Sequence, residues 1–217
     1  MAITRLSLEC CLHKRKCLRV VATVFLVALA EFLTVRPGFS EPPRAGNSHV
    51  KVFLLRGFTN VLSPGIDQLA AELRRRNIDA TVANHAFSAA LAKEATEDCM
   101  SGRARSIVLI GHSFGASAAI GMAEALQQSG MKVALIVTFD PVLKESVPEN
   151  VRKLENFYLS NGVGQKVAES SRFRGSLENV DLKNNGELGH ISVTTSPAIQ
   201  EQVLKDILAA RTPCRRI

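Results

Sequence analysis

Hydrophobic and polar positions along the chain form blocks that predict strands alternating with helices. From residue 49 onward, short runs of β-branched and aliphatic residues are separated by longer stretches with apolar residues at helical spacing. The predicted strands cover residues 50–55, 78–82, 106–110, 132–139 and 154–159, with a short edge strand at 180–182. The predicted helices begin at Pro64 and Pro197 or cover residues 87–97 and 116–126. This alternation predicts an α/β fold, with a mostly parallel sheet of about five or six strands and helices on both faces.

The first and last predicted helices have the same start signal. Ser63 and Ser196 stand at N-cap positions, and each is followed by a proline, which favours the first helical position. In the last helix the apolar residues expected to face inward are Ile199, Val203, Ile207 and Leu208.

The first 30 residues have a different pattern. Lys14-Arg15-Lys16 and Arg19 precede an apolar run of 11 residues that ends in Ala28-Leu29-Ala30, which is similar to a signal peptidase site. As a helix this run would span about 16 Å, roughly half of a hydrocarbon core. The pattern predicts a signal peptide at residues 1–30. An uncleaved membrane anchor and a cytosolic protein are the alternatives.

A segment rich in Pro and Gly follows the leader and is typical of a tether. The expected organisation is therefore a leader at residues 1–30, a tether at 31–48 and a single α/β domain at 49–217. An exported protein, periplasmic or secreted, follows from the leader. Contact with a membrane is expected only through the leader, if it stays uncleaved.

Composition narrows the possible partners. Hydrophobic residues make up 46% and charged residues 22% of the chain, as in an ordinary globular protein. The formal net charge is +7, but residues 1–30 hold five Lys/Arg and one Glu, and the rest holds 22 Lys/Arg and 19 Asp/Glu. The chain has no Trp and one Tyr. A weakly basic body with few aromatic residues argues against nucleic acid as a partner.

The number and spacing of the cysteines bear on two questions, whether the protein contains a disulfide and whether it binds a metal. Three of the five lie in the leader, and Cys99 and Cys214 remain after cleavage. An oxidising destination permits a disulfide between them, and two unpaired thiols are the alternative. Because the His and Cys residues are scattered and form no C-x-x-C or H-E-x-x-H motif, no metal and no cofactor are predicted.

The central candidate for chemistry is the G-x-S-x-G motif Gly111-His112-Ser113-Phe114-Gly115. It lies between the strand at 106–110 and the helix at 116–126, where a sharp turn would expose the Ser113 hydroxyl above the sheet edge. The two glycines allow this turn without a Cβ clash. Ser113 is therefore the predicted nucleophile.

A serine hydroxyl needs a base, and the base needs a partner that sets its tautomer. On a parallel sheet these groups must rise from the carboxyl ends of strands. Asp140 directly follows the strand after the nucleophile and is the predicted acid, with Asp181, Glu178 and Glu187 as alternatives. His190, in a glycine-flanked loop before the last helix, is the predicted base. The other histidines considered are His85, which could line the same crevice, His112 inside the motif and His49 in the tether region.

The predicted oxyanion hole uses two backbone amides. One belongs to Phe114, directly after the nucleophile, and the other to Phe58, in the loop after the first strand. Gly57 in that loop permits close approach of the backbone. Gly57 is expected to contact the substrate, and His112 is expected either to pack or to touch the substrate.

On these motifs the chain, from about residue 50 to 210, resembles a small, lidless member of the α/β-hydrolase superfamily, similar to esterases, lipases and thioesterases. The matching residues are Gly111–Gly115, Phe139-Asp140-Pro141, Gly189-His190 and the Arg56-Gly57-Phe58 loop, and the order Ser113, Asp140, His190 is that of the superfamily. The resemblance implies a serine hydrolase that cleaves small-molecule carboxylic esters or thioesters through an acyl-enzyme.

Two features bear on the substrate and on other functions. Only 49 residues separate Asp140 from His190, so no large cap domain is expected and the crevice should be open, with its mouth near Phe58, Phe87 and Phe114. Two other functions are alternatives. One is an acyltransferase that uses the same three residues, Ser113, Asp140 and His190, and the other is a non-catalytic binding protein on the same fold.

Overall fold

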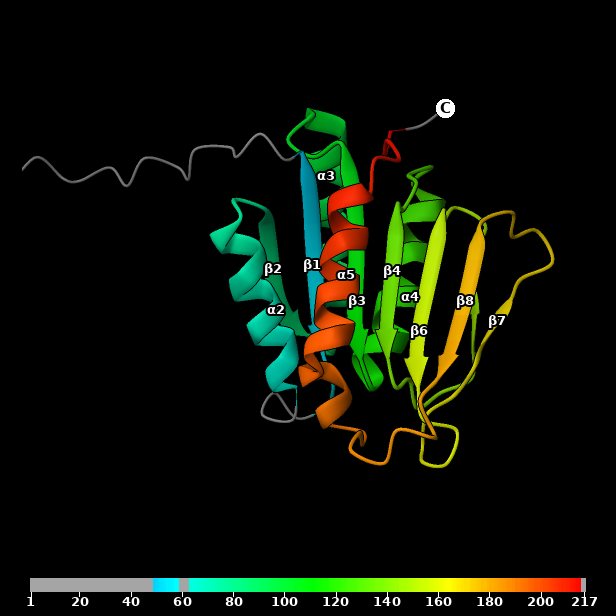
Figure 1. Ribbon diagram of the computed structural model, residues 1–217. Helices are drawn as coiled ribbons and strands as arrows, with labels where there is room; N and C mark the ends of the chain where they lie inside the picture. The colour runs from blue at the N-terminus through cyan, green and yellow to red at the C-terminus, as the bar shows by residue number, and fades with distance from the viewer. Residues whose placement is uncertain (1–48, 59–62, 216–217) are drawn as a thin grey trace, which may run out of the picture. The chain divides into compact units, whose positions relative to one another are not determined.

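Runs of aliphatic and β-branched residues form the central sheet of the computed structural model, which describes residues 49–58 and 63–215. Within this part of the chain, six strands pair in parallel (Figure 1). In spatial order they are β2 (Asp79–Asn84), β1 (Val50–Arg56), β3 (Ser106–His112), β4 (Leu135–Phe139), β6 (Lys153–Tyr158) and β8 (Ser176–Asp181). The predicted leader (1–30) and tether (31–48) lie outside the described residues.

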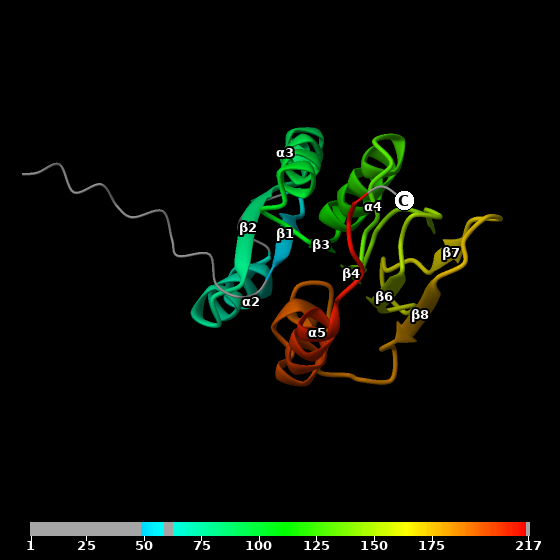
Figure 2. The same ribbon diagram turned by 90° about the horizontal axis from the view of Figure 1, so that it is seen from above.

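Helices cover both faces of this sheet, as the alternating pattern predicts. Figure 2 shows α2 (Pro64–Arg75) and α5 (Pro197–Ala209) on one face, and α3 (Ser88–Ser101) and α4 (Phe114–Gln128) on the other. Two short 3₁₀ helices, η1 (His85–Phe87) and η2 (Ser192–Thr195), precede α3 and α5. Since both faces are covered, every residue of β3 and β4 is buried. Among the described residues, no helix combines the length and apolar character needed to cross a membrane.

The predicted elements are confirmed, with differences in detail. The edge strand β8 is longer than expected, and β5 (Glu145–Val147) and β7 (Val167–Glu169) form a small parallel pair that the pattern did not predict, because three residues are too few for a periodic signal. No cap helix lies between Asp140 and His190 in the described chain, which forms β5 to β8 there. Leu208 was expected to face inward but is exposed, whereas Leu204 is buried.

The order of the strands creates a topological switch point in the sheet, between β1 and β3. From β1 the chain moves outward to β2 and then returns to form β3 on the other side of β1. The carboxyl ends of β1 and β3 therefore lie next to each other where the winding direction changes. Such switch points form the crevices in which open α/β sheets bind ligands.

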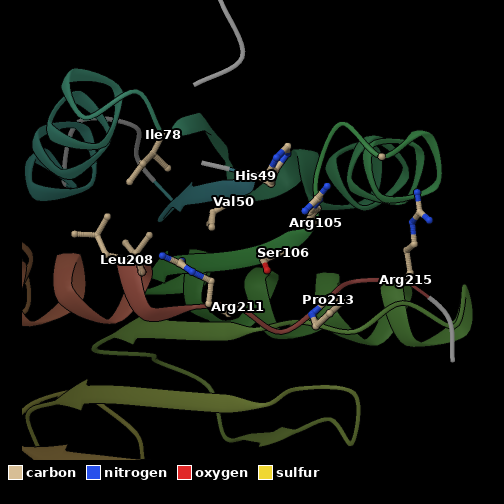
Figure 3. Close-up of a pocket in the computed structure, with 11 residues that line it drawn as sticks. His49, Val50, Ile78, Arg105, Ser106, Leu208, Arg211, Pro213 and Arg215 are labelled. Atoms are coloured by element: carbon tan, nitrogen blue, oxygen red, sulfur yellow. The ribbon is translucent and has the colours of Figure 1, made fainter. Parts of the chain in front are cut away.

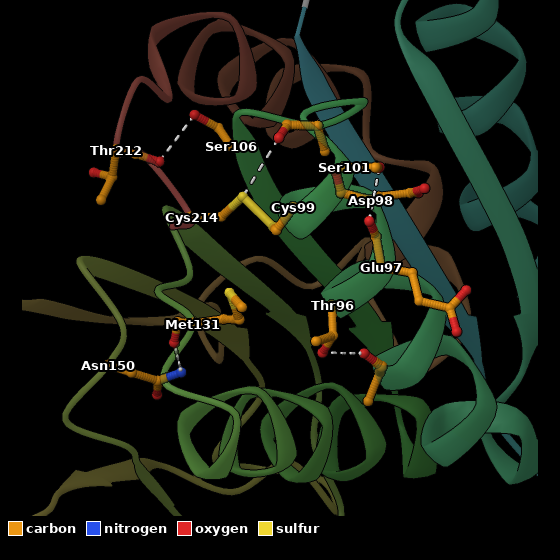
Figure 4. Close-up of a disulfide and its surroundings, with 12 residues drawn as sticks. Thr96, Glu97, Asp98, Cys99, Ser101, Ser106, Met131, Asn150, Thr212 and Cys214 are labelled. Atoms are coloured by element: carbon orange, nitrogen blue, oxygen red, sulfur yellow. Dashed lines mark hydrogen bonds between the residues drawn. A yellow bond between two sulfur atoms is a disulfide. The ribbon is translucent and has the colours of Figure 1, made fainter. Parts of the chain in front are cut away.

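A disulfide holds the carboxyl-terminal segment against α3, near the amino ends of the sheet strands (Figure 4). Cys99, in the last turn of α3, is bonded to Cys214, and both residues are fully buried. Two hydrogen bonds also hold the segment around Cys214: the Cys214 N–H donates to the Arg105 carbonyl at 2.7 Å, and the Ser106 hydroxyl donates to the Thr212 carbonyl at 2.9 Å. Of the two alternatives left open by the sequence, the structure contains the bridge.

Candidate active site

Ser113 occupies the turn between β3 and α4 in an unusual backbone conformation, with φ 58° and ψ −123°. The flanking glycines allow this turn by close packing. A Cβ on Gly111 would lie 2.1 Å from the carbonyl oxygen of Gly115, and a Cβ on Gly115 would lie 2.2 Å from the carbonyl oxygen of Leu55. The helix can approach the strands this closely only because both positions lack side chains. The predicted turn at the motif is confirmed, but the predicted exposure of Ser113 is not, since the residue is only 7% exposed.

The structure brings Ser113, His190 and Asp140 into one hydrogen-bonded row. The Ser113 Oγ lies 3.1 Å from His190 Nε2, and His190 Nδ1 lies 2.6 Å from Asp140 Oδ2. Since a carboxylate only accepts, His190 Nδ1 carries the proton and Nε2 is free to accept the serine proton. This geometry can raise the nucleophilicity of the serine oxygen.

Both carboxylate oxygens of Asp140 have hydrogen-bond partners. The residue is 1% exposed, directly follows β4, and adopts φ 46°. Its second oxygen, Oδ1, accepts the backbone N–H of Leu159 at 2.8 Å. Of the alternative acids, Asp181 instead accepts hydrogen bonds from the backbone and hydroxyl of Ser160, at 3.2 and 2.7 Å. Asp140 is thus the carboxylate that contacts His190.

His112 is buried, in agreement with the packing alternative of its prediction. It is 1% exposed, and both ring nitrogens have partners within the protein: Nδ1 lies 2.8 Å from Ser63 Oγ, and Nε2 lies 2.7 Å from the His190 carbonyl oxygen. Burial lowers the pKa of the His112 imidazole below its ordinary value. With both ring nitrogens bonded within the protein, His112 packs beneath the site; its contact with a substrate remains a prediction.

Ser63 has a role that its N-cap position did not indicate. It precedes α2, but its side chain caps no backbone N–H of that helix. The hydroxyl instead accepts the Gly57 N–H at 3.3 Å and contacts His112. Ser196 likewise makes no side-chain cap before α5. At Ser63 a tertiary contact has replaced the local one.

The loop after β1 lies against Ser113. A Cβ on Gly57 would lie 3.6 Å from Ser113 Oγ and 3.1 Å from Ser113 Cβ, so the glycine permits close approach of this backbone to the serine, as expected. Arg56 anchors the loop by an ion pair with Asp67 on α2. The amides of Phe114 and Phe58 remain the predicted oxyanion donors. Contact of Gly57 with a substrate also remains a prediction.

Aromatic rings surround this end of the loop. The ring centroids of Phe58, His85 and Phe114 lie 6.1 to 6.3 Å from one another. Phe58 is 75% exposed, Phe87 60% and Phe114 40%. His85 therefore belongs to the mouth of the site rather than to the Ser113–His190–Asp140 row. Its Nδ1 lies 3.2 Å from the Gly57 carbonyl oxygen, a contact without any signal in the local sequence.

A separate hollow lies at the other end of the sheet, around the amino ends of β1 and β3 (Figure 3). It has a volume of about 640 Å³ and is lined in part by His49, Arg105 and Arg211. None of its lining residues belongs to the Ser113 site. Among the described residues, no group of three or more His, Cys, Asp or Glu side chains is placed to hold a metal ion.

A family model described as the thioesterase domain matches residues 55–180, more than half of the chain. None of the curated proteins compared with the chain matches it. The matched segment runs from the end of β1 into β8, so it includes Ser113 and Asp140 and ends before His190.

Solved structures give weaker similarities. One is the RedJ thioesterase from the prodiginine biosynthetic pathway in Streptomyces coelicolor, with 9% sequence identity, a TM-score of 0.46, and coverage of 83% of this chain and 95% of that chain. Another is described as a hydrolase of the α/β superfamily from Xanthomonas campestris pv. campestris, with 13% identity, a TM-score of 0.40, and coverage of 71% and 98%.

Proposed function

The chain belongs to the thioesterase domain family, and on this premise we propose that it is a serine hydrolase that cleaves thioesters or esters through an acyl-enzyme on Ser113. The observation that carries the proposal is the hydrogen-bonded row of Ser113, His190 and Asp140, with distances of 3.1 and 2.6 Å. Such a row occurs where a hydroxyl must become a nucleophile at neutral pH.

In the proposed reaction, Ser113 Oγ attacks the carbonyl carbon while His190 Nε2 takes the hydroxyl proton. Asp140 holds the Nδ1–H of His190 and stabilises the imidazolium that forms. The amides of Phe114 and Phe58 are proposed to stabilise the negative oxygen of the tetrahedral intermediate. The bond from the carbonyl carbon to sulfur or oxygen then breaks, and His190 gives its proton to the leaving group. Water attacks the acyl-enzyme carbonyl while His190 takes a proton from it. The bond from the carbonyl carbon to Ser113 Oγ then breaks, His190 returns the proton to Ser113 Oγ, and the acid is released.

The proposed substrate is a small molecule with an apolar part next to the reacting carbonyl. This is supported by the exposed rings of Phe58 and Phe114, which border the loop that contacts Ser113. Apolar substrate surface that leaves water against these rings contributes about 25 cal/mol for each Å² buried. No observation in the described structure favours an acyl acceptor other than water.

We also propose that the protein works outside the cytoplasm. The proposal rests on the predicted leader at residues 1–30 and on the buried bridge between Cys99 and Cys214, since disulfides persist mainly in oxidising compartments. Amino-terminal sequencing of the mature protein from its native host tests the proposal. A start near residue 31 in an extracytoplasmic fraction supports it, and an intact leader on protein from the cytosol contradicts it.

Labelling by a fluorophosphonate probe tests the enzyme proposal. We expect the wild-type chain to be labelled and to hydrolyse thioesters or p-nitrophenyl esters, and Ser113→Ala to lose both properties with an unchanged melting temperature. Ser129→Ala, at the far end of α4, serves as the control and should behave as wild type. A folded wild-type protein that takes no label and hydrolyses none of a chain-length series of esters and thioesters would contradict the proposal.

A further inference from the structure

Both backbone groups of Gly57 are held by side chains, one six residues further along the chain and the other 28. The Gly57 N–H donates to Ser63 Oγ at 3.3 Å, and the Gly57 carbonyl oxygen lies 3.2 Å from His85 Nδ1. Because a carbonyl only accepts, the hydrogen bond requires a proton on His85 Nδ1. The Gly57 backbone is thus held by a serine at the start of α2 and a histidine at the start of η1.

The hydrogen bond from His85 also sets the direction of the next amide. The Gly57 carbonyl and the Phe58 N–H belong to one peptide unit, which is planar and trans, so they point in opposite directions. Among the described residues the structure contains no cis peptide bond. A side chain that holds the carbonyl therefore sets where the Phe58 N–H points. This matters because the Gly57 backbone lies beside Ser113.

The contact to Ser63 continues toward the base. His112 Nε2 lies 2.7 Å from the carbonyl oxygen of His190, so Nε2 must carry the proton and donate it. In the neutral ring Nδ1 is then an acceptor, and the Ser63 hydroxyl donates to it over 2.8 Å. Every donor in this row has an acceptor. The row joins the loop after β1, the end of β3 and the loop that carries His190.

From this network we propose that His85 and Ser63 are positioning residues, which aim the Phe58 amide at the oxyanion, and that His112 ties them to the loop of His190. The inference rests on the proposed hydrolase function. Neither His85 nor Ser63 reacts with the substrate in this role. His85 holds the carbonyl of the Gly57–Phe58 peptide unit itself, and Ser63 holds the N–H of the Arg56–Gly57 unit before it. If the two residues have this role, removing either side chain weakens binding of the transition state more than binding of the ground state.

Two substitutions at His85 test the role directly. His85→Ala removes the donor to the Gly57 carbonyl, whereas His85→Asn keeps an N–H at about the reach of Nδ1. We expect His85→Ala to lower kcat/KM on the order of 10-fold to 100-fold, below the loss from deleting an oxyanion donor outright, and His85→Asn to restore most of it. Exposed His49, at the other end of the sheet, supplies the matched control His49→Ala, which should keep wild-type kinetics.

A pair of inhibitors separates positioning from simple substrate contact. A trifluoromethyl ketone adds to Ser113 and forms an oxyanion, while a non-cleavable thioether analogue binds without one. In His85→Ala and in Ser63→Ala, the affinity for the ketone should fall in parallel with kcat/KM, and the affinity for the thioether should stay within about twofold of wild type. Ser63→Ala provides a second, independent reading should His85→Ala fold poorly.

Each outcome has a clear meaning. Unchanged kcat/KM and ketone affinity in both variants overturn the positioning role but leave the hydrolase proposal intact, because the wild-type chain is active. An equal loss of ketone and thioether affinity also overturns it, since that pattern indicates contact with substrate. A wild-type chain that is neither labelled nor active overturns the hydrolase proposal, and the positioning role with it.

Discussion

At the scale of single residues, the site depends on backbone conformations that residues other than glycine rarely adopt. Ser113 and Asp140 both have positive φ, 58° and 46°, and Asn77 is the other non-glycine residue with positive φ in the described chain. Such conformations cost free energy and persist where the surrounding structure enforces them. Here the turn into α4 and the hydrogen bonds to His190 and Leu159 enforce them. Both strained residues belong to the proposed catalytic row.

The role of Asp140 can be tested with little disturbance to the fold. Asparagine tolerates positive φ and still offers an oxygen to the Leu159 N–H, so Asp140→Asn should fold with a melting temperature close to wild type. Without the carboxylate, the imidazolium of His190 loses its partner, and kcat/KM should fall by about 10²- to 10⁴-fold in an ester hydrolysis assay. Asp181→Asn, at the alternative carboxylate, should change it less than about twofold. Equal losses in the two variants would contradict the assignment.

At the scale of elements, three helical segments meet below the loop that carries His190. Gly65 at the start of α2 lies against η2, and Gln200 of α5 donates from Nε2 to the carbonyl oxygens of Thr194, at 2.8 Å, and Gly65, at 3.2 Å. Since η2 begins two residues after His190, this junction supports the loop that carries His190. The position of His190 depends on how α2, η2 and α5 pack.

Two glycine-to-alanine changes on helices test this junction. A Cβ on Gly65 would lie 1.9 Å from the Thr194 carbonyl oxygen, whereas a Cβ on Gly121, in α4, would meet no atom within 4 Å. We expect Gly65→Ala to lower the free energy of unfolding by about 1–3 kcal/mol, measured in urea, and to lower kcat/KM because η2 must shift. Gly121→Ala should raise the free energy of unfolding by about 0.5–1 kcal/mol without affecting activity. Similar effects of the two changes would show that the junction is not tightly packed.

At the scale of the whole molecule, the disulfide and the Ser113 site lie at opposite ends of the sheet. The bridge closes a loop across a sequence separation of 115 residues, from α3 to the segment after α5. Replacing both cysteines by serine should lower the free energy of unfolding by about 2–4 kcal/mol, seen as a lower melting temperature. Activity at 25 °C should remain, since the bridge contacts no site residue. A loss of activity in a variant that is still folded would contradict this separation.

The buried His112 predicts how stability depends on pH. Burial lowers the pKa of His112 in the folded state, while the unfolded chain has the ordinary pKa of about 6.5. Below that pH the unfolded state binds more protons, so the stability from the neutral imidazole is present above about pH 6.5 and is lost as pH falls. His112→Gln should be less stable than wild type at pH 8, and the difference should shrink at pH 5 when both are unfolded in urea. A difference that does not change with pH would contradict a neutral, buried His112.

Much of this protein is determined by local sequence. The alternation of strand and helix predicts a parallel sheet covered on both faces, and the glycines around Ser113 predict the turn between β3 and α4. Asp140 and His190 could be chosen because catalytic groups on a parallel sheet must follow the strands or lie in loops at one edge. The strand, helix and turn predictions hold because they depend on periodicity and turn chemistry, which short segments carry by themselves. The catalytic roles of Asp140 and His190 remain predictions.

Other features were decided only by the tertiary structure. The contact of Ser63 with His112, the hydrogen bond from His85 to Gly57 and the pairing of Cys99 with Cys214 join residues far apart in sequence, and the burial of His112 depends on such contacts. The three-residue strands β5 and β7 also lack a local signal. The physical reason is that a side chain's environment is set by the segments packed against it, and a residue's neighbours in the chain do not reveal them. Sequence thus predicts which groups could form the site, and packing decides what holds them in place.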